Sequence, residues 1–185
     1  MTEEKSMTFL QQQQKTKPKI EEILSECPDG RQKQICKKFI EYMHNNKTKF
    51  AYAGLSNKWR AKYKSKSLCD IRIDYPSELF SWSVTPFFNH FHRYEDVIIK
   101  DGAQDIFWDN IPHCHYASSS IKAAGCNPNK PCAGGKYIII LNKEFNGICG
   151  GYNCTNTWFK NPDEFTIDTI KKLLELEKTA RNENT

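Results

Sequence analysis

The chain has 185 residues, 38% of them hydrophobic and 12% aromatic, and its formal net charge is +5. This length suffices for a domain with its own core, and the aromatic content predicts a core built largely from Phe, Tyr and Trp. No stretch approaches the roughly 18 apolar residues of a membrane-spanning helix, so we expect no membrane partner. The polar first residues lack the apolar region of a signal peptide, which predicts a cytoplasmic protein with reduced cysteines.

Positive charge is concentrated in the first third of the chain. Residues 11–66 hold fourteen Lys and Arg against five Asp and Glu, a balance of +9, whereas residues 67–185 hold twelve against fifteen, a balance of −3. A basic segment followed by a mildly acidic remainder indicates an anionic partner.

The ends of the chain carry helical patterns. Residues 1–17, with the run Gln11–Gln14 and few apolar groups, predict a disordered N-terminal tail ahead of a single domain over residues 18–185. A short helix is expected from Pro18, and a stronger one from Arg31 to His44 has an apolar stripe at helical spacing. The last helix is expected to begin with Asn161 as its N-cap.

Strand patterns occupy the middle of the chain. Apolar and charged residues alternate from residue 58 to residue 75, which predicts either one long strand or a hairpin turning near Lys64–Ser67. The run at Lys136–Leu141 predicts a strand that returns through a hairpin to Glu144–Ile148. Together these patterns predict an α+β fold: a small, mostly antiparallel sheet with helices at both ends packed on one face, plus a cysteine-rich loop or hairpin.

The segment from His113 to Cys154 holds five of the eight cysteines and two histidines. Thiolate and imidazole ligands at this density predict a structural zinc site, although no C-x-x-C pair is present. We expect the ligands to be Cys114, Cys126, Cys132 and Cys149, with His115 or Cys154 in reserve. Free or buried thiols, and disulfides or a redox pair, remain alternatives.

An enzyme that uses a cysteine of residues 113–154 is a second reading of this segment. Cys114 or Cys149 could act as a nucleophile with His90, His92 or His113 as the base. No recognisable signature surrounds these cysteines, and the sequence does not identify a reaction.

Two further patterns concern binding. Aromatic residues on a small sheet predict a pocket for a small-molecule ligand, with Tyr52, Trp59, Trp82 and Trp108 as its candidate lining. Five cations alternate along one strand face, at Lys58, Arg60, Lys62, Lys64 and Lys66, and could follow a phosphate backbone. We therefore expect a binding or accessory domain with a small-molecule ligand, and nucleic-acid binding through residues 58–66 is an alternative.

The order GLSNKWRAKYKSKSLCDIRI, SWSVTP, FWDNIPHC and KYIIILNKEFNGIC resembles uncharacterised proteins of clostridia-like bacteria, over roughly Lys38 to Arg181. Its strand portion is similar to small α+β bacterial domains with a YdhG-like or effector-binding-like sheet. The effector-binding likeness implies ligand sensing, and it carries over no catalytic residue.

Overall fold

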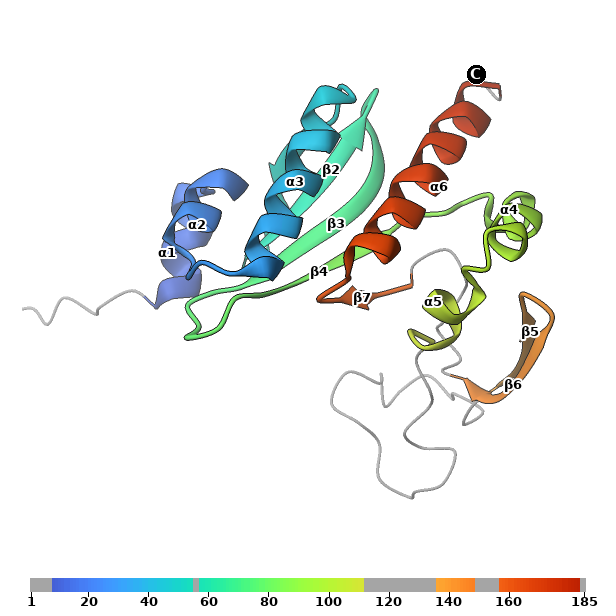
Figure 1. Cartoon of the computed structure of the whole chain (residues 1–185). Helices are drawn as coiled ribbons and strands as arrows, with labels where there is room; N and C mark the ends of the chain where they lie inside the picture. The colour runs from blue at the N-terminus through green and yellow to red at the C-terminus, as the bar shows by residue number, and fades with distance from the viewer. Residues whose placement is uncertain (1–7, 55–56, 112–135, 149–156, 184–185) are drawn as a thin grey trace, which may run out of the picture. The chain divides into compact units, whose positions relative to one another are not determined.

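The computed structural model describes residues 8–54, 57–111, 136–148 and 157–183 (Figure 1). The chain divides into two compact units. Unit 1 comprises Met1–Phe87 and Phe159–Lys171, and unit 2 comprises Phe88–Trp158 and Lys172–Thr185. Both units include residues of the region 18–185, for which the sequence predicts a single domain, and the last helix contributes its first turns to one unit and its remaining turns to the other.

Unit 1 is built on a five-stranded antiparallel sheet in the order β1-β2-β3-β4-β7. Its strands are β1 (Lys49–Tyr52), β2 (Lys58–Tyr63), β3 (Lys66–Asp74), β4 (Ser81–Pro86) and β7 (Phe159–Lys160). The helices before the sheet are α1 (Phe9–Thr16), α2 (Ile20–Glu26) and α3 (Arg31–Asn45), and α6 (Glu164–Glu183) follows it. The predicted α+β class and antiparallel sheet are confirmed.

The two faces of this sheet differ because successive side chains alternate between them. The inner face is apolar, and these of its residues are at most 1% exposed: Trp59, Ala61, Ile71, Ile73, Trp82, Val84 and Phe159. Helix α3 lies across the sheet (Figure 1), and the ring of its Phe39 is 6.0 Å from the Trp82 ring. The predicted apolar stripe of α3 is buried, with Cys36 and Phe39 fully inaccessible. The opposite, outer face carries charged and hydroxyl side chains.

The alternating stretch from residue 58 forms a hairpin. Lys64 and Ser65 have φ of 46° and 67°, the left-handed backbone that a tight two-residue turn requires. A register shift follows between Ala61 and Lys62, so Lys66 lies opposite Tyr63, on the face that Trp59 occupies. The hairpin, which the sequence left open against one long strand, is thus the form that the chain adopts.

The predicted disorder of residues 1–17 is wrong for residues 9–16, which form α1. Thr8 caps this helix, and the Gln11 side chain completes a capping box. Gln13 is only 3% exposed, because its amide exchanges hydrogen bonds with Asn57: Nε2 donates to Asn57 Oδ1 at 2.5 Å, and Asn57 N donates to Gln13 Oε1 at 3.1 Å. A glutamine run can therefore be ordered when one of its amides has a buried partner.

The start of α6 also differs from the prediction. Asp163, not Asn161, caps the helix, and its Oδ1 accepts a hydrogen bond from Thr166 N at 2.8 Å. Asn161 instead pairs with Trp82 of β4, through its own N–H at 2.8 Å and through Oδ1 at 2.9 Å. The residue is thus used to extend the sheet edge before the helix begins.

Unit 2 contains several short elements in addition to the later turns of α6. The short elements are the 3₁₀ helix η1 (Phe91–Arg93), α4 (Glu95–Lys100), α5 (Gln104–Trp108) and a hairpin of β5 (Lys136–Ile140) and β6 (Lys143–Ile148). Gly102, with φ of 65°, separates α4 from α5. A cluster of rings forms its core: Phe88, Phe91, Tyr94 and Phe107. None of the described helices is both long and apolar enough to cross a bilayer.

Candidate functional site

A hollow of about 540 Å³ lies in unit 1 beside the edge strand β1. Residues 17–19 of the α1–α2 connection and residues 20–21 of α2 line it together with His44, Phe50, Tyr52 and Trp59. Sites for small organic ligands commonly enclose roughly 300–1,000 Å³. The volume of this hollow therefore suits a single small molecule.

Aromatic side chains form the walls of the hollow because β1 and β2 pair in register. Tyr52 lies opposite Trp59 on the inner face, and their rings meet edge to face with centroids 6.2 Å apart. Phe50, two residues before Tyr52 on the same face, meets the His44 ring at 5.1 Å in a similar geometry. Ile20 and Trp59 are buried, so the deep part of the hollow is apolar.

The polar groups of the hollow are few and separately placed. The Trp59 Nε1–H donates to the Pro18 carbonyl at 2.8 Å. The Tyr52 hydroxyl is buried and has no hydrogen-bond partner among the described residues, and burial raises its pKa. A buried hydroxyl without a partner costs free energy in the unliganded protein.

Charged groups surround the hollow on its exposed side. Glu21 is engaged by His44, whose Nε2 lies 2.6 Å from its Oε1. Lys17 and Lys19 are exposed, and neither forms an ion pair with a described residue. Two ammonium groups against one engaged carboxylate favour an anionic group on whatever binds there.

Two of the four predicted pocket residues, Tyr52 and Trp59, meet in this hollow, and the other two do not. Trp82 is 1% exposed and donates from Nε1 to Gln32 Oε1 at 2.9 Å, so it is a core residue. Trp108 belongs to unit 2, where its Nε1 donates to the Ile140 carbonyl at 3.0 Å. Residues 17–21 carry no signal in the sequence that marks them as pocket residues, apart from the apolar pattern that begins at Ile20.

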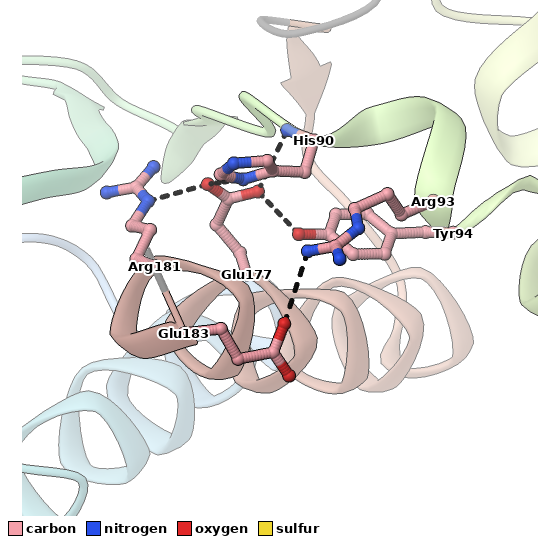
Figure 2. A network of polar contacts seen from close by, with 6 residues as sticks. All are labelled: His90, Arg93, Tyr94, Glu177, Arg181 and Glu183. Carbon is pink, nitrogen blue, oxygen red and sulfur yellow. Dashed lines mark hydrogen bonds and ion pairs between the residues drawn. The ribbon is translucent and has the colours of Figure 1, made fainter. Parts of the chain in front are cut away.

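A second constellation, in unit 2, centres on Glu177 (Figure 2). The Glu177 side chain has no exposed surface and accepts hydrogen bonds from Arg181 Nε at 2.6 Å, from the Tyr94 hydroxyl at 2.7 Å and from His90 N at 3.3 Å. His90 Nδ1 lies 3.2 Å from Glu177 Oε1, the oxygen that also accepts from Arg181. One carboxylate on α6 thus holds the turn before η1.

The network tunes the pKa of its members. Burial raises the pKa of Glu177, but the hydrogen bonds from Arg181 and Tyr94 and the Arg181 charge outweigh burial, so the pKa is lowered overall. Burial and the hydrogen bond to Glu177 raise the pKa of Tyr94 well above its ordinary value. Glu177 is therefore held as a carboxylate and Tyr94 as a phenol.

This geometry resembles half of a catalytic arrangement, because a carboxylate can orient a histidine as a base. A catalytic site would also need a nucleophile. The candidates Cys114 and Cys149 lie outside the described residues, as does His113, so their role stays a prediction. The described contacts of Glu177 fix residues 90–94 against the later turns of α6.

The predicted zinc ligands Cys114, Cys126, Cys132 and Cys149, and the reserve ligands His115 and Cys154, all lie outside the described residues. Within the described ranges, no group of His, Cys, Asp and Glu side chains is arranged to hold a metal ion. The described cysteines are Cys27, Cys36 and Cys69, and all three are buried. Burial raises the pKa of the Cys27 and Cys36 thiols, which makes them poor nucleophiles.

The predicted five-cation strand face is divided by the hairpin. Lys58 and Arg60 bind Asp70 on the neighbouring strand: Lys58 Nζ lies 2.7 Å from Oδ2, and the Arg60 guanidinium donates to both oxygens at 2.8 and 2.9 Å. Asp70 is buried beneath them, and although burial raises its pKa, these two cations lower it overall. Lys64 lies in the turn, and Lys66 lies opposite Tyr63.

Comparison with family models finds none that matches this chain, and comparisons with curated proteins and with solved structures find no significant similarity.

Proposed function

We propose that unit 1 is a binding module for a small ligand that combines a flat apolar body with an anionic group. The observation that carries this proposal is the hollow of about 540 Å³ whose aromatic walls lie beneath two exposed lysines. The apolar depth suits a ring system, because edge-to-face aromatic contacts accommodate a further ring favourably. Lys17 and Lys19 suit a carboxylate or a similar anion at the open side.

The Tyr52 hydroxyl adds specificity to this proposal. A buried phenol without a partner gains a hydrogen bond when a ligand presents an acceptor. A purely apolar ligand leaves the hydroxyl without a partner, and the free-energy cost of burying it remains. A ligand with a polar substituent on its ring is therefore favoured over a plain hydrocarbon. We also propose that this ligand-binding protein is cytoplasmic.

Calorimetric titration with 2-naphthoate tests the proposal, and uncharged 2-naphthalenemethanol serves as the matched probe. We expect 2-naphthoate to bind more tightly than the alcohol. The double variant Lys17→Gln/Lys19→Gln should weaken 2-naphthoate binding by about fivefold, because exposed charge pairs contribute roughly 0.2–1 kcal/mol each.

Binding of the alcohol should be unchanged in this double variant. Lys15→Gln, on the last turn of α1 but outside the lining of the hollow, should leave both affinities at the wild-type value. Equal weakening by Lys15→Gln, or equal affinity for the two probes, would contradict the proposed role of the two lysines.

A further inference from the structure

Strand pairing gathers cations from four strands on the outer face of the unit 1 sheet. Residues directly opposite each other in an antiparallel pair share a face, which places the following residues together: Lys49, Lys58, Arg60, Lys62, Arg72 and Lys160. The strand residues of this face include two carboxylates, Asp70 and Asp74. Six cations against two carboxylates leave four net positive charges. We call these residues the cationic face.

Asp70 and Asp74 neutralise only part of the positive charge of the cationic face. Asp70 binds Lys58 and Arg60, and Asp74 Oδ1 lies 3.7 Å from Arg72 Nε, where both side chains are well exposed. The remaining three cations are exposed and form no ion pair with any described residue: Lys49, Lys62 and Lys160. They are available to an external anion.

Protection against aggregation explains some of these cations but not all. Lysines on edge strands keep sheets from pairing with other chains, which suits Lys49 on β1 and Lys160 on β7. Lys62 and Arg72 lie on the interior strands β2 and β3, where no edge needs protection. A face that serves solubility alone also mixes both signs of charge. The excess of cations therefore points to an anionic partner.

The side chains between the cations suit phosphate better than unpaired bases. The half-buried Thr85 of β4 shares the cationic face, and hydroxyls commonly donate to phosphate oxygens, whereas Ser83 and the Ser81 hydroxyl of the same face are buried. No strand residue of this face is aromatic, and the neighbouring Phe87 ring lies under the Arg60 guanidinium at 5.5 Å. Such a face cannot stack unpaired bases, which is how single-stranded nucleic acids are usually held.

We propose that the cationic face binds the phosphate backbone of a nucleic-acid duplex without reading its sequence. A duplex keeps its bases stacked inside and presents a regular array of phosphates, which exposed lysines on a sheet can contact. Duplex DNA and duplex RNA share this chemistry. The inference does not depend on the ligand pocket, which lies on the inner face of the same sheet.

Fluorescence anisotropy of the full-length chain with short labelled nucleic acids tests this inference, using duplex DNA, duplex RNA and a single strand of the same sequence. We expect duplex binding at low salt that weakens as salt rises, with a logarithmic slope of roughly −3 for three phosphate contacts at about −0.9 each. The variant Lys49→Gln/Lys62→Gln/Lys160→Gln should weaken duplex binding and make this slope shallower by about 1 per lysine.

A variant matched in charge separates the cationic face from net charge. Lys15→Gln/Lys37→Gln/Lys38→Gln removes three exposed lysines from α1 and α3, away from this face, and should retain wild-type affinity and slope. Circular dichroism confirms that both variants are folded. Equal losses in the two variants, tighter binding of the single strand, or no duplex binding at low salt would overturn the inference. The relative affinities of the two duplexes identify which nucleic acid the face prefers.

Discussion

The hydroxyl of Tyr94 donates a 2.7 Å hydrogen bond to Oε2 of Glu177, a carboxylate with no exposed surface. The two residues are far apart in the sequence, one just before α4 and the other on α6 (Figure 2). A buried carboxylate is stable only when its oxygens accept hydrogen bonds. Tyr94 and Arg181 supply such hydrogen bonds and so offset the free-energy cost of burying the Glu177 carboxylate in unit 2.

Removing the Tyr94 hydroxyl should therefore destabilise the protein. We expect Tyr94→Phe to lower the free energy of unfolding by about 1.5–3 kcal/mol, the usual contribution of a hydrogen bond to a charged group. Urea denaturation measures the change. Tyr75→Phe is the control, because the Tyr75 hydroxyl bonds to the exposed Glu26 and its loss should matter much less. A change for Tyr94→Phe no larger than the control would contradict the account.

The lowered pKa of Glu177 predicts an acid-sensitive contribution to stability. Because its pKa in the folded state lies below the ordinary value of 4.5, the contribution is fully present above about that pH and is lost as pH falls through the folded-state pKa. Glu177→Gln should be less stable than wild type at neutral pH and should lose less of its stability on acidification.

Urea midpoints measured from neutral to acidic pH follow this contribution of Glu177. Glu183→Gln is the control, because that carboxylate is 57% exposed on the same helix and pairs with the half-exposed Arg93, and it should follow the wild-type curve. An acid profile of Glu177→Gln parallel to wild type would be incompatible with the predicted linkage.

The amide pair of Gln13 and Asn57 should determine whether α1 stays attached. We expect Gln13→Ala to lower the hydrogen-exchange protection of the α1 amides, because it removes the hydrogen bonds to Asn57 Oδ1 and from the Asn57 backbone N–H. Gln12→Ala changes an exposed neighbour in the same helix and should keep the wild-type protection. Unchanged exchange in Gln13→Ala would show that other contacts hold the helix.

Tyr52→Phe should affect stability and binding in opposite directions. The hydroxyl has no partner among the described residues, so its removal should leave the unliganded protein as stable as wild type or slightly more stable. Binding of a ligand that accepts from this hydroxyl should weaken by about fivefold, the equivalent of about 1 kcal/mol. Thermal unfolding and calorimetric titration of the same sample measure both quantities. A destabilised Tyr52→Phe would indicate that the hydroxyl already has a partner.

The zinc prediction is independent of the pocket and rests on the cysteine-rich segment from His113 to Cys154. Metal analysis of the purified protein should find about one zinc per chain, because four ligands complete a structural site. Cys126→Ser should lower the zinc content, whereas Cys69→Ala, at a buried position on β3, should not. Wild-type protein without zinc would rule out this reading.

The sequence pattern predicted the elements whose burial depends on local periodicity. The stripe of α3 and the alternation of β2 and β3 follow from which side chains avoid water, and both are present as expected. Helix α1 escaped prediction because the partner that buries Gln13 lies 44 residues further along the chain. Local composition cannot report such a contact.

The candidate sites also depend on contacts between residues that are far apart in the sequence. Tyr52 and Trp59 could be named as aromatic residues, but only strand register brings their rings together, and only the α1–α2 connection completes the hollow. Alternation in the sequence predicts one continuous row from the five cations of residues 58–66. The turn at Lys64 removes two of them, and strand pairing supplies Lys49, Arg72 and Lys160 instead.

The most direct test of the proposed binding module is a titration of isotope-labelled protein with 2-naphthoate, followed by proton–nitrogen correlation spectra. The Trp59 indole N–H provides a reporter within the hollow, because it donates to Pro18 in the pocket lining. We predict saturable shifts of this signal and of the amides of residues 17–21 and 50–52, reduced in Lys17→Gln/Lys19→Gln. An unchanged Trp59 signal, with or without shifts elsewhere in the chain, would contradict the account.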